Sequence, residues 1–424
     1  MYKQYVKQAI NLLKENRLLS IISIIGVALS ITMIMCIVLV FRARTANYAP
    51  EINRDRTLIV RSGIAEKIGQ KGWMSGGWIS LKTIKECFYT LQTAEAVTAI
   101  IPMNTRLAST PGGTSDMKCN VSGTDDAFWR IFSFHFLSGK PYGQEYISGE
   151  KKAVVSRTIA RRIFGTEDVV GRTLLLSFVE YTICGVVEDV SVLAERAYSE
   201  VWVPYTTLPA CDENWEDGLL GPYICCILAP DKASLDVVHN EAIQNIERMN
   251  TSQKDFALNL FGAPDTQLDL LARENIFTEP EVTKLIVTGV TVIVILLLVP
   301  AINLSGITLS RMRKRMPEIG IRRAFGASRG ELMWQVLSEN FVLTLCGGLL
   351  GLLLSYVSVL GLREWLLNTD YSGFYSVKTT VSTEMMLSFE VFLYALLFCL
   401  FLNLLSAGIP AWRVSRANII EALK

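Results

Sequence analysis

The chain has 424 residues, of which 50% are hydrophobic and 19% charged, and its formal net charge is +1. This near-neutral total hides an uneven distribution. Residues 43–280 hold 23 Lys and Arg against 30 Asp and Glu, whereas the remainder holds 18 against 10. The apolar residues gather in a few long runs, which is typical of a membrane protein with a soluble portion. The basic residues flank these runs, so the composition does not indicate a nucleic-acid-binding surface.

The N-terminal part predicts a membrane anchor. Residues 1–17 place Tyr and aliphatic side chains at helical spacing with Lys and Arg around them, which predicts a cytoplasmic amphipathic helix. Residues 18–41 carry no charge and are long enough to cross a hydrocarbon core of ~30 Å as transmembrane helix 1. Arg42 follows this run in place of a small-residue cleavage site, so we expect an uncleaved anchor whose N-terminus is cytoplasmic.

Residues 42–284 contain no further apolar span and predict an extracytoplasmic α+β core domain. The predicted strands are 57–61, 173–178, 181–187 and 223–228, and the predicted helices are 79–91, 156–164 and 233–248. Glycine-rich segments at 69–78 and 109–116 are expected to be loops. Six of the nine cysteines lie in this block, so both disulfides and free thiols are open alternatives there.

Three more spans are predicted after this block. Transmembrane helices 2, 3 and 4 are expected at residues 285–304, 332–360 and 387–407. They leave a cytoplasmic loop at 305–331, a short extracytoplasmic loop at 361–386 and a cytoplasmic tail at 408–424. The predicted fold class is therefore a membrane α-helical protein with four transmembrane helices and an inserted α+β domain. Both termini are expected to be cytoplasmic, because the basic residues then lie inside at every crossing.

The loop between spans 2 and 3 has its own helical signals. Residues 311–331 hold seven Lys or Arg against two Glu. Pro317 suits the first position of a short helix, and Gly326 can end it. Ser328 and Glu331 then have the spacing of a capping box that starts the next helix. A short helix with charged and apolar faces at the membrane surface is a candidate docking element.

At this loop the sequence becomes similar to a known family. The run EIGIRRAFGASRGELMWQVLSENFVLTLCGGLLG resembles the signature of FtsX/MacB-type permeases of ABC transporters. In that family the segment is a coupling helix that docks in a separate ATPase subunit. The resemblance assigns the ATPase-coupling role to Glu318, Ile319, Gly320, Ile321, Arg322, Arg323, Ala324, Gly326 and Ala327. Residues 121–142 and 151–190 resemble the family's extracytoplasmic core, which implies a β-rich insert at roughly 105–200.

Two glycines of the third predicted span have a packing role in this interpretation. Gly347 and Gly351 are four residues apart, which leaves a strip without side chains on one helix face. Another helix can approach such a strip closely. We expect a second permease copy to pack there.

No catalytic or metal-binding constellation is predicted. The string GTEDVVGRT at 165–173 departs from a nucleotide-binding P-loop in both spacing and the required Lys. Residues 326–330 match the G-x-S-x-G pattern of hydrolases, but Ser328 fits a helix cap better than a nucleophile. His135 and His239 have no partner at a recognised metal-ligand spacing. The aromatic residues at 73–78 and 128–134 fit either a domain core or a binding surface.

These features and the resemblance together predict a permease subunit rather than an enzyme. ATP and Mg²⁺ are expected on a partner ABC ATPase, with no cofactor in this chain. A second permease copy, either identical or a paralogue, and an outer-membrane or envelope partner are also expected. The resemblance implies mechanotransmission in a bacterial inner membrane, for export or extraction of a substrate or for regulation of an envelope protein. The alternative is a membrane-anchored sensor or scaffold without an ATPase.

Overall fold

The computed structural model describes residues 17–70, 72–113, 116–314, 321, 325, 328–362, 392–394, 396–397, 400–401 and 408. Nearly all of the predicted N-terminal helix, the loop at 361–386 and the C-terminal tail, and most of transmembrane helix 4, therefore lie outside the described residues. The chain divides into two compact units. One is the α+β unit, Arg44–Leu285, and the other contains the long apolar helices on either side of it in the sequence.

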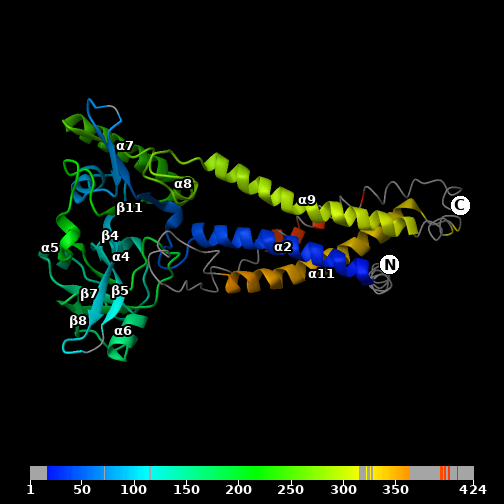
Figure 1. The fold of residues 1–424 in the computed structure, drawn as a ribbon, viewed down its shortest axis with the longest axis horizontal. Coiled ribbons are helices and arrows are strands. Elements are labelled where there is room, and N and C mark those ends of the chain that lie inside the picture. Colours follow the sequence, from blue (N-terminus) through cyan, green and yellow to red (C-terminus); the bar gives the residue numbers. More distant parts are fainter. Residues whose placement is uncertain are drawn as a thin grey trace. The chain divides into compact units, whose positions relative to one another are not determined.

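A large sheet forms the centre of the α+β unit (Figure 1). Its strands are β1 (Thr57–Val60), β4 (Ala96–Ser109), β5 (Met117–Thr124), β6 (Phe136–Gly139), β7 (Lys152–Ser156), β8 (Thr173–Leu176), β9 (Val179–Val187), β10 (Val201–Pro204) and β11 (Ile224–Leu228). The spatial order is β1-β11-β4-β5-β10-β7-β9-β6, and β8 pairs with β4 and β9. The pairs β5–β10 and β7–β9 are parallel and the others antiparallel.

A smaller sheet joins β12 (Phe256–Asn259), β2 (Gly63–Lys67) and β3 (Met74–Gly77) in that order. The glycine-rich segment 69–78 is thus only partly a loop, because its second half forms β3. Gly76 is needed there, since a Cβ atom at this position would lie 2.6 Å from the Cδ1 atom of Ile276. Because Gly76 has no side chain, Ile276, which precedes helix α9 in the sequence, packs directly on strand β3.

Short helices connect the strands of the α+β unit. They are η1 (Arg54–Arg56), α3 (Leu81–Thr83), η2 (Ile84–Phe88), α4 (Phe128–Ile131), α5 (Glu145–Ser148), α6 (Arg157–Phe164), η3 (Tyr205–Thr207), η4 (Pro209–Asp212), η5 (Lys232–Ser234), α7 (Leu235–Ser252) and α8 (Gln267–Ala272). Helix α6 begins at an N-cap, because the Ser156 side chain accepts from the Ile159 amide, and ends at Gly165 in the left-handed conformation. The predicted strands and helices of this unit are confirmed in existence and type.

The core of the α+β unit is continuous. Buried apolar side chains of β1, β4, β7, β10 and β11 join those of helix α7, where Val238, Ala242 and Ile246 face inward. Strands from the segment 105–200 are hydrogen-bonded into the same sheet as β1 and β11. The edges that we assign to a β-rich insert in this segment remain a prediction.

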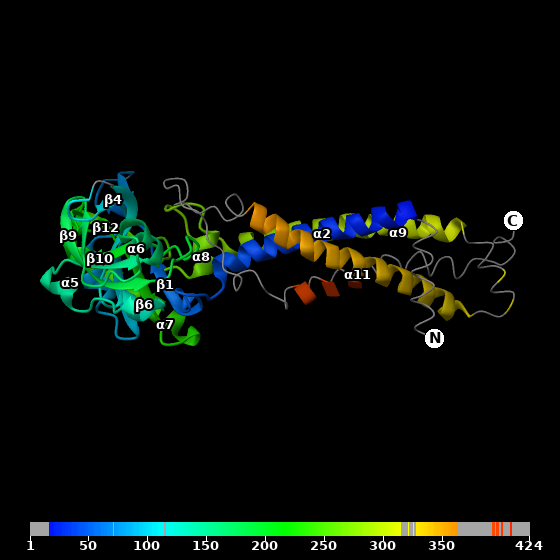
Figure 2. The ribbon, with the colours of Figure 1, turned by 90° about the horizontal axis from the view of Figure 1, so that it is seen from below.

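Three long helices flank this unit in the sequence: α2 (Arg17–Thr45), α9 (Val282–Lys314) and α11 (Arg329–Gly361). Within the described part of the chain, two stretches are long and apolar enough to cross a membrane, Ser20–Thr45 and Asn340–Gly361. The predicted second span, 285–304, lies within α9, whose described apolar part is Val282–Leu296. Helices α2 and α11 lie next to one another in both views (Figures 1 and 2).

Candidate functional site

Two short segments connect the α+β unit to its neighbouring helices. Helix α2 ends at Thr45 and helix α9 begins at Val282. The segments 44–56 and 265–284, here named the junction, lie within the α+β unit. The junction contains three buried charged residues, since Glu51, Arg54 and Asp265 are only 4%, 5% and 3% exposed. Charges are rarely buried without partners, so the contacts of these residues show how the junction is held.

Arg54 occupies the centre of the segment that follows α2. Its Nε atom lies 2.5 Å from an oxygen of Glu51, and its Nη2 atom donates to the Tyr48 hydroxyl at 2.6 Å. The same Nη2 atom donates to the carbonyl oxygen of Leu193, and the guanidinium stacks 4.0 Å from the centre of the Tyr48 ring. Burial disfavours the charged guanidinium, but Glu51 and Tyr48 outweigh it and raise the pKa of Arg54. Arg54 is therefore a permanent cation in this buried position.

Glu51 extends the same network to another part of the unit. Its second carboxylate oxygen accepts from the backbone N–H groups of Arg196 at 2.8 Å and Ala197 at 3.2 Å. A buried ion pair is tolerated when further hydrogen bonds satisfy both partners, as they do here. The pair thus fastens the segment after α2 to residues 193–197, which lie just before strand β10.

The segment before α9 is tied to the end of α2. The Gln267 side-chain amide donates to the backbone oxygen of Arg44 at 2.8 Å. Gln267 is the first residue of α8, a helix fixed at its start by a capping box between Thr266 and Asp269. Since α8 starts in a fixed position, the Gln267 side chain is held where it can reach Arg44. One hydrogen bond therefore links the two segments that lead to α2 and α9.

Asp265 anchors the start of this segment. Its backbone exchanges two hydrogen bonds with Ile59 of strand β1, both of 2.8 Å. Its carboxylate binds Arg273 through two bonds, 2.5 Å from Nη2 and 2.8 Å from Nε. Burial raises the pKa of Asp265, while Arg273 opposes this shift. Arg273 also donates to the carbonyl oxygens of Phe261 and Thr278, so it holds the loop after α8 in place.

An exposed ion pair completes the path into α9. Lys284, in the first turn of α9, lies 2.6 Å from a carboxylate oxygen of Glu274. Hydrogen bonding to Lys284 lowers the pKa of Glu274, and the same contact raises the pKa of Lys284. Because both groups are exposed, this pair contributes little to stability and serves to orient the start of α9.

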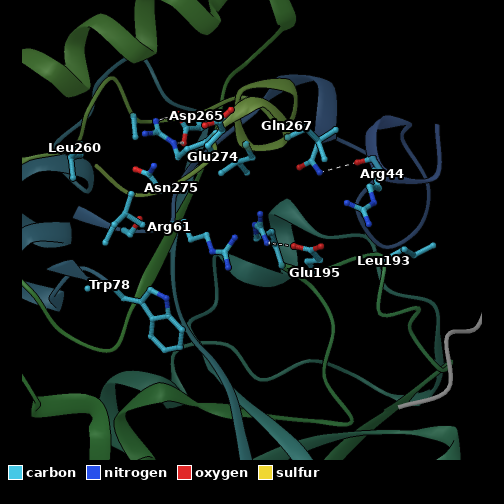
Figure 3. Close-up of a pocket in the computed structure, with 18 residues that line it drawn as sticks. Arg44, Arg61, Trp78, Leu193, Glu195, Leu260, Asp265, Gln267, Glu274 and Asn275 are labelled. Carbon is cyan, nitrogen blue, oxygen red and sulfur yellow. Dashed lines mark hydrogen bonds and ion pairs between the residues drawn. The ribbon is translucent and has the colours of Figure 1, made fainter. Parts of the chain in front are cut away.

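A cavity of about 670 Å³ lies beside these contacts (Figure 3). Its walls come from the end of α2, from residues 61–62 before β2, from Gly77 and Trp78 at the end of β3, from residues 193–196 and from segment 260–276. The labelled side chains in Figure 3 include Arg61 and Trp78 on one side of the opening and Arg44 and Leu193 on the other. The cavity is therefore lined in part by the junction itself.

The predicted coupling segment is described only in part. Ile321 and Phe325 are 50% and 88% exposed, and the Phe325 amide donates to the Ile321 carbonyl at 3.1 Å. The other predicted coupling residues, Glu318, Ile319, Gly320, Arg322, Arg323, Ala324, Gly326 and Ala327, lie outside the described residues. Helix α11 begins as predicted. Ser328 and Glu331 form a capping box, so Ser328 is a helix cap.

The glycine strip of α11 faces a helix of its own chain. A Cβ atom at Gly347 would lie 2.8 Å from Val27 of α2, and one at Gly351 would lie 2.7 Å from the Ala28 backbone oxygen. Thr32 of α2 also donates to the Gly351 carbonyl oxygen at 3.1 Å. The close approach that we expected thus occurs, but the neighbour is α2 of the same chain. Our expectation of a second copy at this strip is corrected, because α2 already occupies it.

The histidines, cysteines and aromatic residues considered in the sequence analysis all lie in the α+β unit or its core, and their contacts account for them. His239 contacts the Gly262 carbonyl oxygen at 2.9 Å, and His135 lies 3.4 Å from Glu188 on the surface. The cysteines of the α+β unit are free thiols. Phe128 and Phe132 are buried in an aromatic cluster with Trp129, whereas Trp73 and Trp78 are about one-third exposed. Both alternatives for the aromatic residues, a domain core and a binding surface, therefore have examples. Phe128 and Phe132 belong to the core, and Trp78 lines the cavity.

Sequence reasoning missed the junction. Glu51 and Arg54, three residues apart, read like an ordinary surface pair, and nothing local in the sequence marks their burial. Gln267 and Arg44 are 223 residues apart in the chain, so only the fold brings them together. One signal was available: charged residues are frequent in the segments next to the predicted spans, as at 42–56 and 265–284.

Comparisons with known families cover most of the chain. A family model described as the MacB-like periplasmic core domain matches residues 20–244. A second, described as the FtsX-like permease C-terminal, matches residues 290–419. The first match ends within α7 and the second begins within α9, so residues 245–289 lie between the two matches.

Several curated proteins are similar in sequence. The uncharacterized ABC transporter permease YknZ of Bacillus subtilis is 24% identical over 72% of this chain and 69% of that protein. The macrolide export ATP-binding/permease protein MacB 1 of Yersinia pestis bv. Antiqua is 29% identical over 73% of this chain and 44% of its own length. MacB of Hahella chejuensis is 24% identical over 100% of this chain and 60% of that protein. The chain thus spans roughly half the length of these MacB relatives.

Two solved structures have domains similar to this chain. The extracellular domain of the noncanonic ABC-type transporter YknZ from Gram-positive bacteria has a TM-score of 0.34, 12% identity, and coverage of 47% of this chain and 100% of that one. The periplasmic region of MacB from Actinobacillus actinomycetemcomitans has a TM-score of 0.36, 13% identity, and coverage of 48% and 88%.

Proposed function

Since the chain belongs to the FtsX/MacB-type family of ABC transporter permeases, we propose that it couples ATP hydrolysis on a separate ATPase subunit to movement of its extracytoplasmic domain. The MacB-like model alone matches more than half of the chain.

The hydrogen bond between Gln267 and Arg44 is the observation that carries this proposal. Arg44 lies in the last turn of α2, and Gln267 begins the segment that continues into α9. A displacement of either helix therefore reaches the same contact. The buried pair of Glu51 and Arg54 then connects this contact to the main sheet through residues 193–197. Fully hydrogen-bonded buried networks are rigid, which is what a mechanical connection requires.

The cytoplasmic end of the proposed path is the coupling segment. Ile321 and Phe325 are four residues apart and both expose their apolar side chains. Residues at this spacing share one face of a helix, and such a face fits a hydrophobic groove on a partner. In the proposal the partner is an ABC ATPase, which binds ATP and Mg²⁺. Glu318, Arg322 and Arg323 supply charges that would select the partner and speed its association.

The proposal also assigns partners and a location. The protein resides in a bacterial inner membrane with four spans and both termini cytoplasmic, and pairs with a second permease copy. Its work is done outside the membrane, as export or extraction of a substrate or as control of an envelope partner. The permease itself is not an enzyme in this scheme.

Co-purification of the ABC ATPase encoded nearest to this gene tests the proposal. The ATPase should co-purify with the parent permease and be lost with the double change Glu318→Lys and Gly320→Trp. Phe325→Ser should weaken the association, because Phe325 is the more exposed of the two described apolar side chains of the segment, at 88% against 50% for Ile321. The matched control is Phe178→Ser, which removes a side chain that is 81% exposed on the α+β unit.

Three outcomes are informative. Loss of the ATPase with the coupling-segment variants, but not with the control, supports the docking role. Parent-level binding by the Glu318→Lys, Gly320→Trp variant contradicts it. If no ABC ATPase associates with the parent protein, the alternative of a sensor or scaffold without an ATPase is favoured.

A further inference from the structure

One edge of the small sheet is open. Strand β3 lies at this edge, and the backbone N–H of Lys67 in β2 donates to the Trp73 carbonyl oxygen at 3.3 Å beside their ladder. Hydrogen-bonded and non-hydrogen-bonded pairs alternate along an antiparallel ladder. This alternation directs the backbone N–H and C=O groups of Met74 and Gly76 away from β2. Within the part of the chain that the structure describes, these outward groups have no hydrogen-bond partner.

Other edge strands are closed by the chain itself. Strand β12 forms the opposite edge of the small sheet. There the Asn250 side chain of α7 accepts from the Leu258 N–H and donates to the Leu258 carbonyl oxygen, both at 2.8 Å. Strand β1, at one edge of the large sheet, exchanges two backbone hydrogen bonds with Asp265 at Ile59. The fold therefore satisfies these edge positions and leaves those of β3 unused.

The residues of the open edge lack the usual protection against strand pairing. Soluble proteins protect exposed edges with charged side chains, proline or bulges. Residues 73–78 read WMSGGW, without charge or proline, and the β2–β3 ladder has no register shift. The large side chains Trp73, Met74 and Trp78 are instead 38%, 48% and 37% exposed. Aromatic residues and Met are enriched in protein interfaces, so this edge is suited to pair with another strand.

The open edge of β3 is complementary to itself. If two antiparallel copies pair about a two-fold axis at Ser75, Met74 of one copy lies opposite Gly76 of the other. Every outward N–H group then meets an outward carbonyl oxygen, which is the isologous arrangement of a symmetric dimer. Gly76 has no side chain and Ile276 packs over it. The Met74 side chain of the second copy can therefore contact Ile276.

We propose that β3 pairs antiparallel with β3 of a second copy of this chain, centred on Ser75, which joins two three-stranded sheets into one. The choice of occupant rests on our proposed function, which includes a second permease copy, but it does not rest on the ATPase. A strand of four residues is short, whereas stable interfaces bury roughly 1,200–2,000 Å². The pairing therefore depends on membrane helices that keep two copies at high effective concentration.

This pairing would connect the junctions of the two copies. Gly77 ends β3 and Trp78 follows it, and both residues line the cavity beside the junction. A movement transmitted through the junction of one copy would therefore reach the β3 contact, and through it the second copy.

Disulfide crosslinking of the full chain in native membranes tests the pairing. In a cysteine-free background, Ser75→Cys places a thiol opposite its own equivalent, in a pair whose Cα atoms lie about 4.5 Å apart, a distance that a disulfide spans. We expect a mild oxidant to give a covalent dimer on a non-reducing gel, either without nucleotide or with a non-hydrolysable ATP analogue. Ser177→Cys, also half-buried but at the turn between β8 and β9, is the control and should remain monomeric.

Two further variants test the hydrogen bonds of this pairing. Met74→Pro, combined with Ser75→Cys, removes an outward N–H group that β2 does not use, so the small sheet keeps its ladder. The loss of one hydrogen bond from each copy should lower the initial crosslinking rate about tenfold or more. Met74→Leu in the same background keeps both the N–H group and an apolar side chain, and should crosslink like Ser75→Cys alone.

Three results would overturn the proposal. The first is a Ser75→Cys dimer yield no higher than that of Ser177→Cys in both nucleotide conditions. The second is an unchanged crosslinking rate with Met74→Pro. The third is an adduct whose mass fits another protein rather than two copies, since an envelope protein would then occupy the edge.

Co-purification of the ATPase from the same membranes is measured separately. If the dimer is absent and the ATPase is retained, strand pairing at β3 is wrong and the proposed function stands. If the dimer forms and no ATPase associates, the pairing stands and the proposed coupling is wrong.

Discussion

The side-chain amide of Gln267 donates to the backbone oxygen of Arg44 at 2.8 Å, across 223 residues of sequence. Arg44 is in the last turn of α2 and Gln267 begins α8. This bond therefore joins the segment that follows α2 directly to the segment that leads into α9. The backbone oxygen is present whatever residue occupies position 44. The link is therefore tested through the glutamine.

Gln267→Met removes the donor at nearly constant size. We expect the free energy of unfolding to fall by only about 1 kcal/mol, the usual net value of one hydrogen bond. The larger effect should be local, as faster hydrogen exchange of the backbone amides of α8 and of residues 46–56. Hydrogen–deuterium exchange with mass spectrometry measures both regions. The control is Gln244→Met, an exposed glutamine on α7. Unchanged exchange in both regions would show that the bond does not hold the junction together.

The buried pair of Glu51 and Arg54 gives a prediction on stability. Arg54→Met leaves the Glu51 carboxylate buried without its cation, and loss of one partner of a buried pair costs about 3–5 kcal/mol. Arg56→Met is the matched control, two residues away. Arg56 also lies 2.5 Å from a glutamate, Glu95, but this pair is 25% and 51% exposed. Exposed pairs contribute roughly 0–1 kcal/mol, so this variant should lose far less stability.

Pulse proteolysis in increasing urea measures both arginine variants in the full-length protein. The urea midpoint of the α+β unit should fall strongly for Arg54→Met and slightly for Arg56→Met. Similar midpoints for the two variants would mean that burial of the Glu51–Arg54 pair does not determine its contribution.

Features with local causes could be predicted from the sequence, and features with distant causes could not. The capping box of Ser328 and Glu331 depends on residues three apart, and it forms as predicted. Helix α6 follows likewise from Ser156 before it and Gly165 after it. By contrast, the glycine-rich segment 69–78 carries turn residues, yet its second half pairs as β3 because Ile276 and Ile64 pack over Gly76. That contact depends on a residue 200 positions further on.

The same distinction holds for the candidate site. The coupling residues around Glu318 were assigned through resemblance, and only Ile321 and Phe325 among the residues at 318–327 are described. Burial of Glu51 and Arg54 depends on residues 193–197 lying over them, which no local pattern indicates. The cavity follows from the packing of five separate segments. Its arginines look in the sequence like the usual basic flanks of membrane spans.

The contact of α11 with α2 predicts the effect of larger residues in the glycine strip. Gly351→Ile places a side chain against the Ala28 backbone oxygen, which cannot turn aside as a flexible side chain can. Overpacking of this kind typically costs about 1–3 kcal/mol. Gly347→Ile meets the Cβ atom of Val27 and should have a similar effect. Gly289→Ile on α9, where a Cβ has nothing within 4 Å in the structure, is the control.

Disulfide crosslinking measures this change within one chain. In a cysteine-free background, cysteines replacing Ile24 in α2 and Thr344 in α11 are introduced, and their crosslinking yield is compared among the variants. The yield should fall for Gly347→Ile and Gly351→Ile and remain at the parent level for Gly289→Ile. Membrane insertion should be unaffected, because isoleucine raises the hydrophobicity of the span. Parent-level crosslinking in both strip variants would contradict close packing at these glycines.

The orientation of the chain in the membrane is the last prediction. The positive-inside rule places the basic loop containing Ser328 in the cytoplasm and the α+β unit outside. Phe178 is the most direct reporter of the α+β unit, because it is 81% exposed at the turn between β8 and β9. Ser328 is exposed as well and precedes the first residue of α11.

In a cysteine-free background, Phe178→Cys in intact spheroplasts should react with a membrane-impermeant maleimide. Ser328→Cys should react only after the membrane is permeabilised. Because both positions are exposed, a difference between them reports the side of the membrane rather than burial. Labelling of Ser328→Cys in intact spheroplasts would place the coupling segment outside, where no ATP is supplied, and would contradict both the topology and the proposed ATPase docking.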